Sequence, residues 1–369
     1  MRKHNANNEL TKREYLAFLR NAGGRSAATL DVVAAALHRF EAFNRYKSFK
    51  TFRREQAISF KEHLAAQTNE KTGKPLSKAT LYSTLRTLRA FFEWLSREPG
   101  YRKALVFSDA AYFNVTDNEA RIATASRQRP APSLEQVRRM VQVMPSATAV
   151  ERRDRALVAL TMLTGARDAA IASLKLKHLD LAKRTLFQDA RDVKTKRAKT
   201  ITTVFFPVGE PFEVAVCEWA QGLRRDHLFG PDDPLFPATH VAVGETGLFG
   251  VQGLERRHWS TASPIRRVFK RACAAAGLPH YNPHSLRQTL IRLAYDLNLS
   301  PRELKAWSQN LGHESPLTSL VSYGALSPHE QADVMAALSR PKARPRDVET
   351  ALATIKAALG TPRAGEPVA

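Results

Sequence analysis

Apolar residues at helical spacing dominate the first hundred positions of the chain. Val33, Leu37 and Phe40 recur at intervals of three and four residues, and leucine and phenylalanine follow the same period through residues 77–95. Residues 51–67 indicate a third helix between these two. The first part of the chain is therefore predicted to be a small bundle of helices joined by short basic turns.

The second half begins with helices, changes to strands and then returns to helices. Ser133 and Gln136 have the spacing of a capping box and follow a basic, proline-containing segment, residues 127–133, that is typical of an interdomain linker. β-Branched and aromatic runs on both sides of a cationic turn predict a β-hairpin over residues 183–208. The fold is predicted to be mainly α with a small β-sheet or hairpin. The predicted parts are a helical domain at 8–125, a second domain at 133–340, and a C-terminal helix with a flexible tail at 341–369.

Basic residues outnumber acidic ones in both halves of the chain. Lys and Arg number 57 against 35 Asp and Glu, which gives a formal net charge of +22. Basic residues spread along the whole chain indicate an extended polyanionic partner, with nucleic acid as the first candidate and an anionic membrane surface as the second. No stretch approaches ~18 uninterrupted apolar residues, and the N-terminus lacks the apolar core of a signal peptide. Cys217 and Cys273 are too few for a disulfide framework, so a cytoplasmic location is expected.

Three short clusters in the second half carry residues suited to phosphate chemistry. Arg167 follows a predicted helix that ends in Thr-Gly, and His284 and Arg287 lie three apart on a predicted helix, where they would share a face. His313 precedes Tyr323 by ten residues. Each cluster alone is common: such an arginine usually forms a salt bridge, and a late tyrosine usually packs. The histidines have no Cys or carboxylate partner at ligand spacing, so no metal site is predicted.

The order of these clusters resembles the tyrosine recombinase (phage integrase) family of site-specific DNA recombinases. The family's Arg, His-x-x-Arg, Leu-Gly-His and Tyr motifs correspond to TGAR, HSLR, LGH and SYG, with a lysine-rich hairpin after the first. The resemblance covers about residues 133–340, and residues 8–100 look more loosely like the family's helical (SAM-like) core-binding domain. It implies an α+β catalytic domain that cleaves and rejoins DNA strands through a 3′-phosphotyrosine intermediate, with no cofactor, metal or ATP.

The resemblance gives the arginines and the tyrosine roles that suit their chemistry. Arg167 and Arg287 would neutralise the non-bridging phosphate oxygens with forked, permanently charged donors. Tyr323 would be the nucleophile. Because the phosphotyrosine keeps the energy of the broken bond, rejoining needs no external energy source.

The remaining candidates would move or hold protons. Lys194, at the tip of the predicted hairpin, is the expected general acid for the departing 5′ oxygen, and Lys196 and Lys199 are alternatives. His284 would exchange a proton with the tyrosine, and His313 would hydrogen-bond the phosphate.

The chain departs from the family pattern at three positions. Ala170 stands where many members carry an acidic residue, so another group must orient Arg167. Gln288 stands where His is frequent. The ten-residue spacing from His313 to Tyr323 is one more than expected.

The resemblance also implies partners. Double-stranded DNA is the expected substrate. Lys78, Arg86 and Arg89 lie on the predicted helix at 77–95, where they could reach DNA phosphates. The alternative is that each is a solvated surface charge with no role in binding. Four protomers would exchange strands through a Holliday junction, with accessory DNA-bending or directionality factors as further partners, and the DNA-bound protein would be nucleoid-associated. The alternatives are a resolvase or topoisomerase use of the same chemistry, a non-catalytic DNA-binding accessory protein, and a helical RNA-binding protein.

Overall fold

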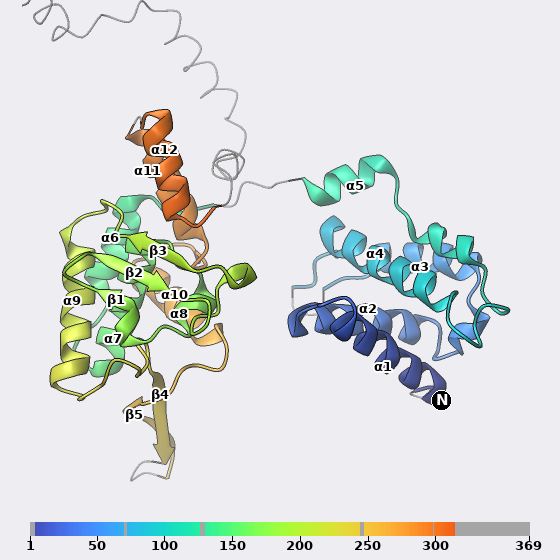
Figure 1. The fold of residues 1–369 in the computed structure, drawn as a ribbon, viewed down its shortest axis with the longest axis horizontal. Coiled ribbons are helices and arrows are strands. Elements are labelled where there is room, and N and C mark those ends of the chain that lie inside the picture. The colour runs from blue at the N-terminus through green and yellow to red at the C-terminus, as the bar shows by residue number, and fades with distance from the viewer. Residues whose placement is uncertain (1–3, 70–71, 126–129, 244–246, 298, 314–369) are drawn as a thin grey trace, which may run out of the picture. The chain divides into compact units, whose positions relative to one another are not determined.

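The computed structural model describes residues 4–69, 72–125, 130–243, 247–297 and 299–313 (Figure 1). Contacts between Cα atoms divide the chain into two compact units, Met1–Ser126 and Arg127–Ala369. Each unit has its own cluster of buried hydrophobic residues. Within the described ranges, no helix is long and apolar enough to span a membrane.

The described residues of the first unit form helices, as predicted, with one isolated β-bridge between Thr68 and Pro75 (Figure 1). Its α-helices are α1 (Ala6–Asn21), α2 (Ala27–Phe43), α3 (Arg54–Ala66), α4 (Lys78–Leu95) and α5 (Asp117–Thr124), with 3-10 turns at Phe49–Thr51 and Phe107–Phe113. Ser77 caps α4 through its side chain, which accepts a hydrogen bond from the Thr80 N–H. Phe40 and Phe92 pack edge-to-face at the centre of an aromatic core.

The second unit combines helices with two small sheets. Its elements are α6 (Leu134–Val143), α7 (Ala149–Thr164), α8 (Asp168–Ile171), a 3-10 turn at Leu176–His178, β1 (Leu179–Asp180), β2 (Thr185–Gln188), a 3-10 turn at Lys196–Ala198, β3 (Ile201–Val204), α9 (Glu210–Arg225), β4 (Ala238–Val243), β5 (Phe249–Glu255), α10 (Ser263–Ala275), α11 (Ser285–Asp296) and α12 (Pro301–Asn310). Strands β1, β2 and β3 form one antiparallel sheet in that order, and β4 pairs with β5. The predicted start of α6 at Ser133 and the predicted hairpin, β2–β3, are both confirmed.

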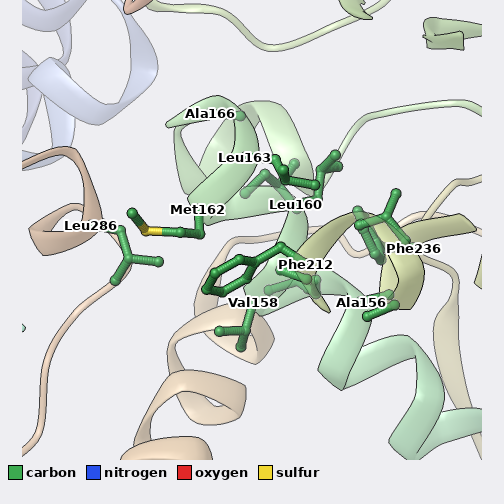
Figure 2. Packing of buried hydrophobic residues seen from close by; sticks show 14 of the residues in the cluster. Ala156, Val158, Leu160, Met162, Leu163, Ala166, Phe212, Phe236 and Leu286 are labelled. Carbon is green, nitrogen blue, oxygen red and sulfur yellow. The ribbon is translucent and has the colours of Figure 1, made fainter. Parts of the chain in front are cut away.

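Helix α7 is the central helix of this unit. Every residue from Ala156 to Thr164 is buried, and the helix packs against α6, α9, α10 and α11. Figure 2 shows Met162 beside Leu286 of α11, and Val158 beside Phe212 of α9. This packing fixes the end of α7 and the start of α11, which carry two of the candidate motifs.

Candidate active site

The Thr-Gly-Ala-Arg turn ends α7 and presents Arg167. Gly165 adopts a left-handed conformation with φ of 59°, and its N–H donates to the Thr161 oxygen at 2.8 Å. A Cβ atom at this position would lie 2.8 Å from Leu311 Cδ2 and 3.2 Å from Leu290 Cδ1. Glycine is therefore required here for both its conformation and its size. The chain then places Arg167 at the N-cap of α8.

Arg287 joins three segments that are far apart in the sequence. Its side chain is buried within α11, and Nη1 donates to the Gly165 oxygen at 2.5 Å. Nη2 donates to the Leu311 oxygen at 2.6 Å and lies 2.9 Å from His313 Nε2. A guanidinium can only donate hydrogen bonds, so Nε2 of His313 accepts, which leaves the proton of the neutral ring on Nδ1.

The Leu-Gly-His segment is held against the first sheet at the end of α12. The Asn310 side chain bonds both main-chain groups of Val204 on β3, each at 2.8 Å, as a neighbouring strand would. Gly312 has a φ of 70°, and a Cβ there would lie 2.7 Å from Ile201 Cδ1. This close approach brings His313 beside the start of β3.

A cavity of about 240 Å³ lies where these segments meet. It is lined by Arg167, Lys196, Arg197, Lys199, Ile201, Gly312 and His313. The lining residues include four permanently basic side chains and no carboxylate. Such a cavity favours an anion of phosphate size over a cation or a neutral ligand.

The two arginines are poorly compensated, which strengthens this preference. The Arg167 guanidinium has no hydrogen-bond or ion-pair partner among the described residues, and burial lowers its pKa. Burial, followed by the nearby charge of Arg167, lowers the pKa of Arg287 to about 9. Desolvated cations without a counter-ion are stabilised by a bound anion.

His313 is held in its neutral form. Burial, then the charges of Arg287 and Arg167, lower its pKa to about 4, and His284 and Lys196 act in the same direction. At neutral pH the ring therefore carries one proton, which can be donated to a phosphate oxygen.

The structure thus places Arg167 and His313 in the lining of one cavity, and Arg287, which does not line it, in contact with His313. His284 is the exposed N-cap of α11 and has helical backbone angles, and its main-chain oxygen accepts from the N–H of the buried Arg287 at 3.2 Å. Tyr323 lies outside the described residues.

The lysine-bearing connection is longer than a tight hairpin turn. Residues 189–200 connect β2 to β3, and Lys194 is exposed but does not line the cavity, as Lys196 and Lys199 do. Arg197, which the sequence analysis did not single out, lines the cavity as well; its place in a run of basic residues was the only signal for it.

No carboxylate follows Arg167 at the position common in the family. Ala170 is buried there, and the neighbouring Asp168 pairs with Arg266 at 2.9 Å instead. Gln288 is half-buried.

The candidate DNA-binding residues of the first unit differ in their surroundings. Lys78 and Arg86 are exposed on α4. Arg89 is half-buried and already engaged, with Nε 2.6 Å from a Glu93 oxygen and Nη1 2.7 Å from Asn114 Oδ1. Lys78 and Arg86 are therefore freer than Arg89 to meet a phosphate.

Comparison with known proteins places this chain and its fold in one family. The sequence model described as "Phage integrase family" matches residues 133–330. Among curated proteins, tyrosine recombinase XerC of Corynebacterium glutamicum is 26% identical over 249 residues, covering 66% of this chain and 67% of the relative. XerC of Alcanivorax borkumensis is 28% identical over 251 residues, covering 66% and 68%.

Two solved structures share the fold. A lambda integrase (75–356) dimer bound to a COC′ core site has a TM-score of 0.56 at 16% identity, covering 86% of this chain and 97% of that one. XerH site-specific recombinase bound to difH substrate has a TM-score of 0.54 at 16% identity, covering 88% and 83%. The protein is an enzyme that breaks and rejoins DNA strands by site-specific recombination. The chain belongs to the phage integrase family.

Proposed function

We propose that this recombinase cleaves one DNA strand with Tyr323 and holds the cut end as a 3′-phosphotyrosine. The tyrosine oxygen forms a bond to phosphorus while the bond from phosphorus to the 5′ oxygen breaks. The phenolic proton passes to His284, and a lysine of the 189–200 connection protonates the departing oxygen. One phosphoester bond replaces another, so the reaction requires no ATP.

The observation that carries this proposal is the uncompensated charge of the cavity. Arg167 has no partner among the described residues, and Arg287 is held by main-chain oxygens that do not neutralise it. Fixed cations of this kind stabilise the charge that grows on the phosphate in the transition state, and they do so without reorganisation. They supply the charge that a metal ion provides in other phosphoryl-transfer enzymes, and the proposed mechanism is therefore metal-independent.

The general acid is proposed to be Lys196 or Lys199. Lys194 was the choice from the sequence, but Lys196 and Lys199 line the cavity together with Arg167 and His313. A general acid must come within hydrogen-bonding distance of the group that it protonates, so geometry favours this pair.

The proposed assembly follows from DNA recognition. The first unit, residues 8–125, would act as a core-binding domain whose exposed cations contact phosphates, and residues 133–340 would form the catalytic domain. Four protomers on DNA would exchange strands in pairs, and accessory DNA-bending or directionality factors would set the direction of the reaction. A cyclic tetramer of this kind uses heterologous contacts that close into a ring. In cells the protein would associate with the nucleoid.

A covalent-capture assay tests the chemistry. Sequences selected by binding from a pool of random duplexes are prepared with a nick beside each candidate cleavage position, so that the released fragment diffuses away and the adduct accumulates. The wild-type protein should give a covalent protein–DNA band on a denaturing gel, and Tyr323→Phe should give none. Binding without any adduct would support an accessory DNA-binding role, and an adduct in Tyr323→Phe would assign the nucleophile to another tyrosine.

A further inference from the structure

A cluster of charged residues lies at the base of the 189–200 connection, outside the cavity. Asp192 belongs to this connection, and its carboxylate lies 3.1 Å from Lys175 Nζ and 2.9 Å from Lys177 Nζ. Both lysines also reach Asp232, at 3.3 Å and 2.9 Å. Two carboxylates thus share two ammonium groups in one network.

His178 lies beside this network, and its Nε2 atom makes no hydrogen bond to it. Its side chain is 1% exposed, and Nδ1 accepts a hydrogen bond from the Lys175 N–H at 2.9 Å. The proton of the neutral ring is therefore on Nε2, which lies 3.5 Å from Asp192 Oδ2. Burial lowers the pKa of His178, which keeps the ring neutral. Asp192 is therefore held by two cations, and the N–H of His178 lies nearby without donating to it.

The lysines that hold Asp192 stand on a fixed part of the fold. The N–H groups of Leu176 and Lys177 donate to the oxygens of Asp233 and Pro231, at 3.0 Å and 2.8 Å. Main-chain bonds thus tie residues 174–178 to residues 231–235, so the network has a rigid support.

The connection is anchored next to Asp192 and exposed further on. Val193 is buried, and the Lys194 N–H donates to Ser173 Oγ at 2.9 Å. Beyond this point residues 196–200 are exposed, and Arg197 and Ala198 adopt left-handed φ values of 60° and 50°. Left-handed backbone is unfavourable for residues other than glycine. Contacts elsewhere in the protein must therefore hold residues 196–200 in this conformation.

We propose that Asp192 is a positioning residue, which fixes the start of the 189–200 connection so that its downstream lysines reach the scissile phosphate. The side chain of Asp192 does not line the cavity, so it acts through Lys196 and Lys199. This inference rests on the proposed function, because it assumes that one of those lysines is the general acid. Small displacements of catalytic groups are costly, since a misplacement of about 1 Å can slow a reaction by about 100-fold.

The test uses a DNA substrate in which sulfur replaces the bridging 5′ oxygen at the scissile phosphate. A thiolate leaves without protonation, because a thiol has a pKa of about 8.5, far below that of an alcohol. Asp192→Asn should slow cleavage of the ordinary nicked duplex by roughly 10- to 100-fold and cleave the sulfur duplex at the wild-type rate. Asp192→Glu should recover most of the ordinary rate. Asp226→Asn removes an exposed carboxylate whose one ion pair among the described residues is with its neighbour Arg225, and should leave both rates unchanged.

The outcomes separate this inference from the function on which it rests. A wild-type rate for Asp192→Asn on the ordinary duplex, or equal slowing of both duplexes, would overturn the positioning role. The combined variant Lys196→Ala, Lys199→Ala should cleave only the sulfur duplex. If sulfur fails to rescue this variant, the general acid has been assigned wrongly and the positioning role falls with it. Rescue of the lysine variant with normal cleavage by Asp192→Asn rejects the positioning role alone.

Discussion

Arg287 donates a hydrogen bond to the main-chain oxygen of Gly165 at 2.5 Å, although 122 positions separate the two residues in the sequence. The same guanidinium bonds the Leu311 oxygen, so a single side chain connects the turn after α7, the start of α11 and the end of α12. Bonds to the main chain therefore hold this guanidinium in place within the protein. Such preorganisation is what makes fixed charges effective in a transition state.

Gly165→Ala should destabilise the catalytic unit and abolish adduct formation. The new Cβ would meet Leu311 and Leu290 at distances that require the packing to shift, and a left-handed alanine is itself strained. The two costs together are roughly 2–5 kcal/mol in the free energy of unfolding. Urea unfolding followed by tryptophan fluorescence measures this quantity.

Gly277→Ala is the matched control. Gly277 also has a left-handed φ, of 68°, but no atom lies within 4 Å of the position that a Cβ would take. This variant should lose only about 1 kcal/mol and keep its activity. Equal losses in the two variants would show that the contact with Leu311 and Leu290 contributes nothing.

Arg167→Gln should make the DNA-free protein more stable while removing cleavage. The charge of Arg167 is partly desolvated, lacks a partner among the residues described, and lowers the pKa of Arg287. Removing it relieves this repulsion, with a gain of roughly 0.5–2 kcal/mol of the kind seen when a functional site is neutralised. Thermal unfolding measures the gain. Added sulfate should stabilise the wild type more than the variant, and a variant less stable than the wild type would argue against an uncompensated charge.

The sequence predicted which arginines and histidine meet at the candidate site better than it predicted how they are held there. Arg167, Arg287 and His313 meet because glycines allow close approach at two turns, and those glycines are visible in the motifs. The pairing of Arg287 with main-chain oxygens was not predictable, because it depends on how distant segments pack. The sequence left Lys194, Lys196 and Lys199 as candidates for a similar reason, since which of them lines the cavity depends on the course of the 189–200 connection and on its tertiary contacts.

The β4–β5 hairpin shows a second limit of pattern reading. Val243 pairs with Phe249, and both side chains are exposed. Strand prediction assumes that apolar side chains point inward, and Gly250 and Gly253 further weaken the strand pattern. The hairpin was therefore not predicted from sequence.

His313 should make the wild type lose stability as the solution is acidified. Its folded pKa of about 4 lies below the ordinary 6.5, so the unfolded chain binds a proton first as the pH falls. The stabilising contribution of the neutral His313 ring is fully present above pH 6.5. It is lost as the pH falls from 6.5 to 4, and no further loss from this group follows below that range. Allowing for solvent screening of a half-buried ring, the loss is about 1–2 kcal/mol.

The measurement compares urea unfolding of the wild type and His313→Gln across this pH range. Glutamine carries no titrating group, so the difference in stability between the two proteins isolates the histidine. Arg287, Arg167, His284 and Lys196 are the charged neighbours that oppose protonation of this ring. A difference that does not change between pH 6.5 and 4 would show that the ring is not held neutral.

Lys78→Ala and Arg86→Ala should each weaken DNA binding and lower its dependence on salt, and Arg89→Ala should do so less. A cation that neutralises a phosphate releases about one counter-ion, so losing it reduces the slope of log K against log salt by about 1. Lys78 and Arg86 are exposed on α4, whereas the Arg89 guanidinium is bound to Glu93 and Asn114 and would have to leave both to meet a phosphate. Fluorescence anisotropy with a selected duplex at several salt concentrations gives the slopes. If Arg89→Ala changes the slope as much as Arg86→Ala, the Glu93 pair must open on DNA; if none of the three changes it, DNA contacts another face of the first unit.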